Sequence, residues 1–252
     1  MKNTLHVLRI IVFFAALSLC LWGCSTHQAD DTPAAAPTAP VLPSPTADSP
    51  TKEYTVEMKK DVVYKPEGHN KHKLDVYLPE GLEPPFPTLL LLHGGYSDKT
   101  EMRSLAEHLV QRGFAVVAPN RRDMPEAGYP APVEDAFCAL GWLVANAGEY
   151  GFKPERGVVG GHSAGGTLAA MLAAVNEPAQ FTQNCPYDLP DAGFLRGAIS
   201  FTGVFDFSAA EGALQSYYAD YLGVETDADP LWVEASPVTW LDGSGPPFLL
   251  IH

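Results

Sequence analysis

The 252-residue sequence has few basic side chains and few cysteines. Lysine and arginine number 16 against 30 aspartate and glutamate residues, which gives a formal net charge of −14. Binding to a phosphate backbone requires clustered cations, and the basic pair Arg121-Arg122 is isolated. We therefore expect no nucleic acid among the partners. The 4 cysteines form no C-x-x-C pair, so a zinc site is not expected either.

The sequence also lacks a hydrophobic run of the length that a transmembrane helix normally needs to span a bilayer. Near the N-terminus, basic residues precede the apolar segment Ile10–Trp22, which is too short to span a bilayer and has the pattern of a signal peptide. It continues into Gly23-Cys24, and Leu21–Cys24 resembles a bacterial lipobox. We expect residues 1–24 to be a lipoprotein-type signal, with Cys24 lipidated and the protein exported to the bacterial cell envelope. A plain secretory signal and an uncleaved anchor are the alternatives.

Residues 25–52 are rich in proline, alanine, threonine, serine and aspartate, with almost no large apolar side chains. Such a segment cannot bury enough surface to offset its ordering entropy. Proline at this density favours an extended chain. We predict a disordered tether that holds the following domain away from the membrane.

Residues 53–252 alternate short apolar strands with helical segments, and we interpret them as one domain. Strands are predicted at Tyr54–Tyr64, Lys73–Leu78, Thr88–His93, Ala115–Pro119, Gly157–His162, Gly197–Thr202 and Phe248–His252. Helices are predicted at Glu101–Arg112, Val133–Tyr150, Ala164–Asn176 and Ala213–Leu222. The run Leu89–Leu92 is continuously apolar, as expected of a central strand covered on both faces. The pattern predicts an α/β fold with a doubly wound, mostly parallel sheet whose first two strands form an antiparallel edge.

Gly161-His162-Ser163-Ala164-Gly165 is a G-x-S-x-G string. An apolar strand enters it and a helix of small residues leaves it, which is the strand–turn–helix context of a nucleophile elbow. Because strand and helix approach closely there, Gly161 and Gly165 are expected to be glycines for lack of space. The amides at the helix N-terminus favour a developing oxyanion. Ser163 is therefore the candidate nucleophile, and a glycine-rich turn with an incidental serine is the alternative.

His93-Gly94-Gly95 follows the leucine-rich strand. A His-Gly-Gly turn at this point supplies backbone amides to an oxyanion hole, because glycine leaves the approach to the amides open. We predict Gly94, Gly95 and the amide of Ala164 as the donors, with His93 supporting the loop instead of transferring protons. An ordinary strand-to-loop turn is the alternative.

Together, His93–Gly95, the helix end Asn146–Phe152 and the string Gly161–Gly166 resemble the esterase branch of the α/β-hydrolases, near the BD-FAE-like and carboxylesterase families. The similarity covers about residues 74–252. The resemblance implies an α/β-hydrolase fold and hydrolysis of carboxylic esters through an acyl-enzyme on Ser163, without a metal or organic cofactor. The expected substrates are small-molecule or polysaccharide-linked esters, such as acetyl or feruloyl esters.

The catalytic triad of this fold runs serine, acid, histidine in chain order, and His252 is the only histidine after Ser163. In the resembling families, Pro246–His252 matches a strand that precedes both the acid and the histidine. We therefore expect a truncated copy of a longer protein, missing its last strand or strands and C-terminal helix and nearly inactive as given. The alternatives are a complete, catalytically dead chain, or His252 acting as base with Asp206 or Asp242. Asp206 is the reserve acid, and helix N-capping is its competing role.

Cys138 and Cys185 fall in segments that can be neighbours in this fold, and an oxidising compartment would permit a disulfide between them. Two buried thiols are the alternative. We expect Asp123–Pro132 and Phe205–Leu231 to line the substrate pocket. Two further functions stay open: a serine exopeptidase-like hydrolase, which shares the elbow string, and a hydrolase-fold binding module without catalysis.

Overall fold

The computed structural model describes residues 53–66, 68–190 and 194–252. Three predictions lie outside this part of the chain and stay predictions: the signal at residues 1–24, lipidation of Cys24, and the tether at residues 25–52. Among the described helices, none is both long and apolar enough to cross a bilayer.

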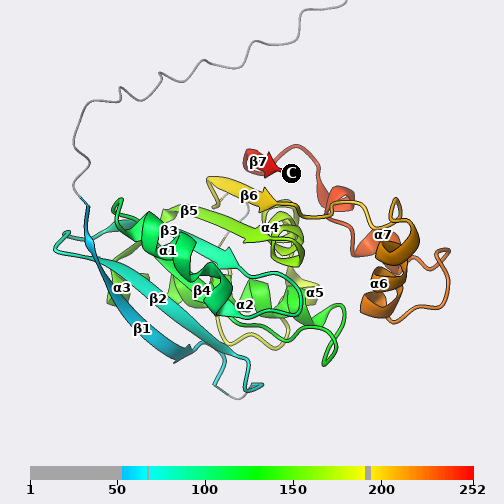
Figure 1. The fold of residues 1–252 in the computed structure, drawn as a ribbon, viewed down its shortest axis with the longest axis horizontal. Helices are drawn as coiled ribbons and strands as arrows, with labels where there is room; N and C mark the ends of the chain where they lie inside the picture. The colour runs from blue at the N-terminus through cyan, green and yellow to red at the C-terminus, as the bar shows by residue number, and fades with distance from the viewer. Residues whose placement is uncertain (1–52, 67, 191–193) are drawn as a thin grey trace, which may run out of the picture. The chain divides into compact units, whose positions relative to one another are not determined.

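A seven-stranded sheet in the order β1-β2-β4-β3-β5-β6-β7 forms the centre of the described part (Figure 1). The strands are β1 (Thr55–Val63), β2 (Lys73–Glu80), β3 (Phe86–Leu92), β4 (Ala115–Pro119), β5 (Phe152–His162), β6 (Gly197–Phe201) and β7 (Phe248–Ile251). The β1–β2 and β2–β4 pairs are antiparallel, and all other neighbours are parallel. The predicted mostly parallel sheet with an antiparallel edge is confirmed.

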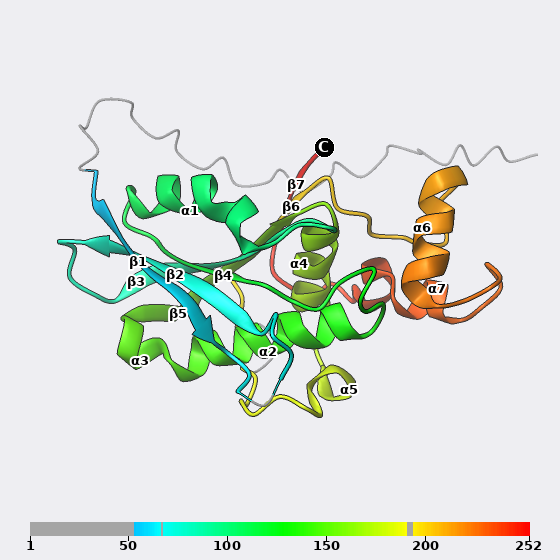
Figure 2. The ribbon, with the colours of Figure 1, turned by 60° about the horizontal axis from the view of Figure 1, so that its bottom comes forward.

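The helices cover both faces of the sheet, with α1 on one side and α2 and α3 on the other (Figure 2). The helical elements are η1 (Lys99–Met102), α1 (Arg103–Val110), α2 (Ala131–Ala145), α3 (Ala147–Tyr150), α4 (Ala164–Ala174), α5 (Ala179–Thr182), α6 (Gly212–Leu222), α7 (Leu231–Glu234) and η2 (Pro237–Trp240). Two predicted single helices are each split, into η1 with α1 and into α2 with α3. The one-turn helices α5, α7 and η2 were not predicted, because a single turn leaves no periodic pattern.

The position of strand β3 explains why the run Leu89–Leu92 does not alternate apolar and polar residues. Leu90 and Leu92 pack in the core shared with α2 and α4, whereas Leu89 and Leu91 pack in a second core with α1. Successive side chains of a strand point to opposite faces, and both faces here are covered by helices. Burial of each leucine contributes roughly 1.5–3 kcal/mol, so the run fixes β3 in the middle of the sheet.

The order of the strands opens a crevice at the carboxyl edge of the sheet. β3 lies next to β5, and the chain leaves β3 through α1 on one face of the sheet and leaves β5 through α4 on the other. The loops after β3 and β5 therefore diverge, and a ligand site is expected between them. His93–Gly95 follows β3 and Ser163 follows β5, so the fold brings the two predicted motifs to this point.

Residues 202–247, between β6 and β7, form an insertion that carries α6, α7 and η2. In Figure 1, α6 and α7 lie at the end of the described part away from β1. The insertion has its own apolar cluster, in which Phe207 and Tyr218 stack with ring centroids 3.9 Å apart and Trp232 is buried. It is a small second layer of structure built beside the carboxyl edge.

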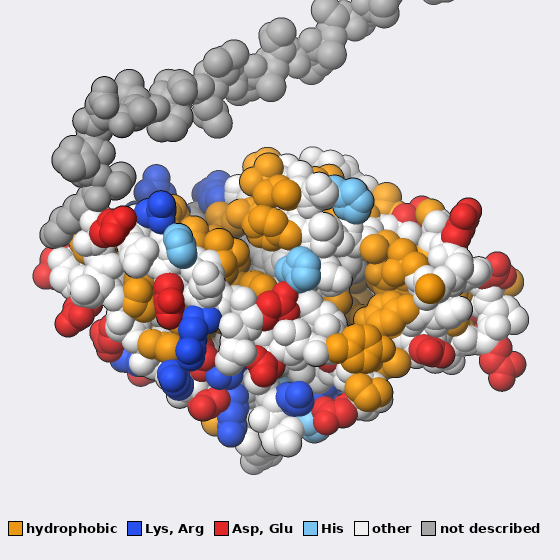
Figure 3. All heavy atoms as spheres, in the orientation of Figure 1, with side chains coloured by type: hydrophobic (Ala, Val, Ile, Leu, Met, Phe, Trp, Pro, Cys, Tyr) orange, Lys and Arg blue, Asp and Glu red, His pale blue; other side chains and the backbone are white. Residues whose placement is uncertain are grey.

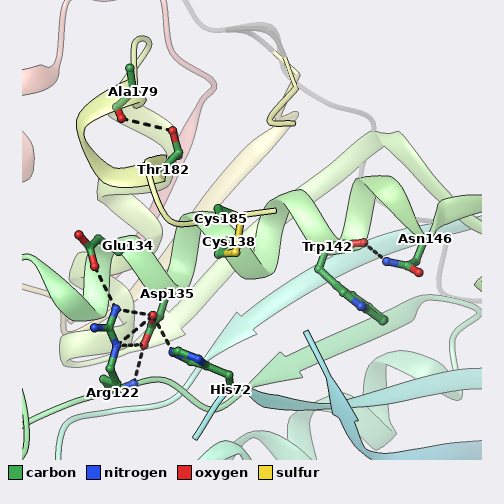
Figure 4. The surroundings of a disulfide bond; sticks show 10 residues. All are labelled: His72, Arg122, Glu134, Asp135, Cys138, Trp142, Asn146, Ala179, Thr182 and Cys185. Atoms are coloured by element: carbon green, nitrogen blue, oxygen red, sulfur yellow. Dashed lines mark hydrogen bonds and ion pairs between the residues drawn. A yellow bond between two sulfur atoms is a disulfide. The ribbon is translucent and has the colours of Figure 1, made fainter. Parts of the chain in front are cut away.

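A disulfide and a buried ion cluster hold α2 in place (Figure 4). Cys138 of α2 is bonded to Cys185, with the Cα atoms 5.4 Å apart; of the two alternatives for these cysteines, the structure contains the bond. Nearby, the fully buried carboxylate of Asp135 accepts hydrogen bonds from His72 Nε2 at 3.0 Å and from the Arg122 guanidinium. Burial raises the pKa of Asp135, but these hydrogen bonds outweigh it and lower that pKa to about 2.

Candidate active site

Ser163 occupies a strained turn between β5 and α4. Its backbone has φ 51° and ψ −119°, a conformation that costs a non-glycine residue roughly 1–3 kcal/mol. Two hydrogen bonds fix the turn: the Ser163 amide donates to the Phe201 carbonyl at 2.7 Å, and the Ser163 carbonyl accepts from the Thr167 amide at 3.1 Å. Ser163 is exposed at the carboxyl edge of the sheet, as the elbow interpretation expects.

Close approach of three backbones explains the glycines on either side of Ser163. A Cβ at Gly161 would overlap the backbone of Gly165 and come within 2.7 Å of the Leu92 carbonyl oxygen. A Cβ at Gly165 would overlap the carbonyl oxygens of Leu92 and His93. Any side chain would therefore separate β5, α4 and the end of β3, which is the steric reason given in the sequence prediction.

The turn after β3 lies against the start of α4. A Cβ built on Gly95 would stand 3.7 Å from the Cβ of Ala164. Within the described ranges, neither the Gly95 amide nor the Ala164 amide donates a hydrogen bond to another residue. Both predicted donors are thus free for a ligand, and they belong to segments that lie against each other.

Gly94 differs from its predicted role. Its amide donates to Glu101 Oε2 at 2.9 Å, so this donor is already engaged in the structure. The same carboxylate binds His162 Nδ1 through Oε1 at 2.7 Å. Burial of Glu101 opposes its ionisation, but hydrogen bonds from Ser97, Gly94 and His162 outweigh it and lower the pKa of the carboxyl. Glu101 thereby joins the turn after β3 to the residue that precedes Ser163.

Arg121, which follows β4, holds the other side of the same turn. Its guanidinium is buried and donates to the His93 carbonyl at 2.9 Å, to the Gly94 carbonyl at 3.3 Å and to Asp123 at 2.7 Å. In a trans peptide the C=O and the following N–H point in opposite directions. With the Gly94 carbonyl drawn toward Arg121, the Gly95 amide must point away from it. Arg121 therefore sets the direction of a predicted oxyanion donor.

His93 supports this turn and is not placed for proton transfer, as expected. It is buried, and its Nδ1–H donates to the Gly94 carbonyl at 2.7 Å. Burial and the charge of Arg121 lower the pKa of His93 to about 3, so the ring is neutral near pH 7.

The two candidate acids lie in surface turns. Asp206 is exposed, and its carboxylate accepts from the Ser208 amide at 3.0 Å; this is a local turn, and no helix begins there. Asp242 accepts from the Asn176 side chain at 3.0 Å. Asn176 follows the C-terminal end of α4, whereas Ser163 precedes its N-terminal end, and an 11-residue helix is about 16 Å long. Asp242 therefore lies by the end of α4 that is farther from Ser163.

His252 lies at the same edge of the sheet as Ser163 but is not connected to it. The register pairs His162 with Phe201 and Phe201 with Ile251, which puts His252 two strands away, about 10 Å. Among the described residues, neither the His252 ring nor the Ser163 hydroxyl has a hydrogen-bond partner. No contact in this part of the chain joins them into a catalytic pair.

A small pocket lies beside the elbow and under α6. Its lining residues come from α4 (Ala164, Thr167, Leu168), from the segment after β4 and the start of α2 (Arg121, Asp123, Pro132), and from the insertion (Phe207, Tyr217, Tyr218, Tyr221). Both segments that were expected to line the pocket contribute to it. Figure 3 shows hydrophobic side chains gathered around a hollow between the sheet and the lobe that carries α6.

Sequence reasoning missed Arg121, Glu101 and Tyr217. Arg121 binds backbone carbonyls that lie 28 and 27 residues earlier, and carbonyls leave no mark in the sequence. Glu101 was predicted only as part of a helix. The signal that could have found Arg121 and Glu101 is their position shortly after β4 and after the His-Gly-Gly turn, where the switch point collects polar side chains.

Known proteins resemble this chain in both sequence and fold. Esterase LipQ of Mycobacterium tuberculosis is 26% identical over 245 residues, covering 90% of this chain and 55% of that protein. The probable carboxylic ester hydrolase LipM of the same organism is 28% identical over 176 residues, covering 66% of this chain and 40% of LipM. The chain thus spans about half the length of these two curated relatives.

The structure of esterase B from Lactobacillus Rhamnosis (HN001) is similar with a TM-score of 0.66 and 25% identity, covering 81% of this chain and 67% of that one. The predicted α/β-hydrolase fold is confirmed by this similarity. The BD-FAE family model matches residues 74–252, which include the turn after β3, the elbow and the insertion. The chain belongs to the BD-FAE family of α/β-hydrolase-fold proteins.

Proposed function

We propose that the protein is a serine hydrolase that cleaves carboxylic esters with Ser163 as the nucleophile. The observation that carries the proposal is the exposed hydroxyl of Ser163 on a strained turn, beside the unpartnered amides of Gly95 and Ala164. Amides aimed at a site where negative charge develops are a major source of rate enhancement in acyl transfer. The esterases among the relatives support this chemistry.

In the proposed reaction the Ser163 oxygen attacks the ester carbonyl carbon. The carbonyl oxygen becomes an oxyanion that accepts hydrogen bonds from Gly95 and Ala164. The alcohol leaves to give an acyl-serine, and water then hydrolyses the acyl-serine. A base must take the hydroxyl proton, and no described residue contacts that hydroxyl. We therefore propose that the 252-residue chain alone turns over esters slowly.

Ser163 can be tested without relying on turnover. A fluorophosphonate should label Ser163 covalently, as read by intact mass and peptide mapping, and added imidazole should accelerate labelling by supplying the missing base. Ser163→Ala should abolish the label, and p-nitrophenyl acetate should be hydrolysed far below ordinary esterase rates. A folded chain that takes no label at Ser163, even with imidazole, would contradict the proposal and favour a binding module.

We also propose export and lipid anchoring through Cys24. The Cys138–Cys185 disulfide supports the export part, because such bonds persist mainly in oxidising compartments. Metabolic labelling with a radioactive fatty acid should mark the protein in bacterial cells, and Cys24→Ser should remove the mark. A label that survives Cys24→Ser would refute the anchor.

A further inference from the structure

Tyr217 of α6 brings a hydroxyl from the insertion to the predicted oxyanion site. The hydroxyl oxygen lies 3.2 Å from the position that a Cβ on Gly95 would take, and the same position is 3.7 Å from the Cβ of Ala164. The phenol oxygen, the Gly95 backbone and the start of α4 therefore surround one small volume. Tyr217 and Ala164 also line the same pocket.

The Tyr217 hydroxyl has no hydrogen-bond partner among the described residues, although the side chain is half-buried. Two other tyrosine hydroxyls are engaged, since Tyr64 donates to the Asn120 carbonyl at 2.9 Å and Tyr129 donates to Glu234 at 3.0 Å. Unlike the buried Tyr77 hydroxyl, the Tyr217 oxygen is not enclosed by the protein and is open to solvent or to a ligand. Because the phenol donor borders the same small volume as Gly95 and Ala164, it can bind the same ligand oxygen as their unpartnered amides.

The ring of Tyr217 is held in place while its hydroxyl stays unpaired. Its centroid lies 5.2 Å from that of Tyr218, 6.1 Å from that of Tyr96 and 6.5 Å from that of Tyr221, with which it stacks. Burial, together with the nearby charge of Asp123, raises the pKa of Tyr217 to about 12. The group is therefore a neutral phenol at ordinary pH, and it can donate a hydrogen bond without transferring its proton.

We propose that Tyr217 is a further catalytic residue, which donates a hydrogen bond to the ester carbonyl oxygen beside the amides of Gly95 and Ala164. It takes the place of the Gly94 amide, which is engaged by Glu101. The site is then shared between the sheet and the insertion, and it is incomplete without α6. This inference rests on the proposed function, because it assumes that Ser163 is the nucleophile.

The test is the substitution Tyr217→Phe in the full chain, which keeps the ring and removes only the hydroxyl. Fluorophosphonate labelling of Ser163 is followed by intact mass in imidazole buffer over a range of reagent concentrations. The limiting rate of labelling should fall about 100- to 1,000-fold, as for loss of one oxyanion donor, and the concentration giving half that rate should change little. A purely structural role would instead lower the unfolding temperature and leave the limiting rate of the folded protein unchanged.

Tyr187→Phe is the matched control, because Tyr187 is also half-buried but lies next to Gly141 on α2. It should label at the rate of the unsubstituted chain. All variants are compared at a temperature at which circular dichroism shows each to be folded. If Tyr217→Phe labels as fast as the unsubstituted chain while Ser163→Ala does not label, the role of Tyr217 is refuted and Ser163 stands. If the unsubstituted chain itself takes no label, both proposals fall.

Discussion

Arg121 and Arg122 are consecutive in the sequence, yet they serve two different regions. Arg121 is almost completely buried, and its guanidinium binds the Asp123 carboxylate and the backbone carbonyls of His93 and Gly94. The Arg122 side chain is 25% exposed and binds the carboxylates of Glu134 and Asp135 on α2. We name these regions the turn cluster (His93, Gly94, Glu101, Arg121, Asp123) and the helix cluster (His72, Arg122, Glu134, Asp135).

The comparison separates contacts that orient the candidate active site from contacts that hold α2 in place. In the turn cluster Arg121 pairs with Asp123 and also donates to two backbone carbonyls, and the carbonyl contacts fix the direction of the Gly95 amide. In the helix cluster opposite charges meet, and the Cys138–Cys185 disulfide fastens the same helix a turn further on. The clusters should therefore respond separately, one in the chemistry of Ser163 and the other in the free energy of unfolding.

The largest expected effect is a loss of stability when the Cys138–Cys185 disulfide is removed. Reducing the disulfide, or replacing both cysteines with serine, opens a loop with a sequence separation of 47 residues. The loop-closure estimate gives a loss of about 4 kcal/mol in the free energy of unfolding. Urea denaturation with and without reductant measures it. The labelling rate of Ser163 in folded protein should stay constant, and a parallel fall would show that the two regions are coupled.

Arg121→Met should act on the site. Without the guanidinium, the Gly94 carbonyl is no longer held and the Gly95 amide loses its fixed direction. We expect fluorophosphonate labelling of Ser163 to slow about 100-fold, equivalent to about 2.7 kcal/mol. Arg121→Lys keeps a cation and should recover part of the rate. Arg122→Met is the matched control, which should lower the free energy of unfolding and leave the labelling rate unchanged. If both substitutions slow labelling equally, the two clusters do not differ in their effect on Ser163.

The smallest effect expected is an acid-dependent loss from the helix cluster. The folded-state pKa of Asp135 is depressed from 3.8 to about 2, so its stabilisation is complete above about pH 4 and is lost as the pH falls through 2. The shift corresponds to about 2 kcal/mol. Urea midpoints measured between pH 5 and pH 2 should show this loss. In Asp135→Asn that part of the pH dependence should vanish. If the loss of stability below pH 5 persists in this variant, it comes from other carboxylates.

The parts of the fold that follow local rules could be predicted from the sequence. β4 was predicted at its observed bounds, and the elbow glycines Gly161 and Gly165 were predicted with their steric reason, because both depend on residues adjacent in the chain. The engaged amide of Gly94 could not be predicted. Its acceptor, Glu101, is set by how η1 packs after β3, which no short pattern encodes.

The contribution of the insertion was the hardest part to predict. The segment containing Tyr217 was expected to line the pocket, but three of its tyrosines do so and the sequence does not rank them. Only the placement of α6 against the sheet shows that the Tyr217 hydroxyl reaches Gly95 and that the other two line the pocket walls. Contacts between elements far apart in the chain depend on tertiary packing, which propensity and periodicity do not describe.

Four described residues other than glycine have a positive φ, and three of them follow strands at the carboxyl edge: Tyr96 after β3, Ser163 after β5 and Thr202 after β6. Each of these strained backbone conformations costs roughly 1–3 kcal/mol. Together they lower the free energy of unfolding by a substantial share of the total for a typical domain. Glycine would adopt the same backbone with less strain. Glycine at these three positions should therefore raise the thermal stability. Because the three residues border the proposed active site, however, substitutions meant to stabilise the protein are better made elsewhere.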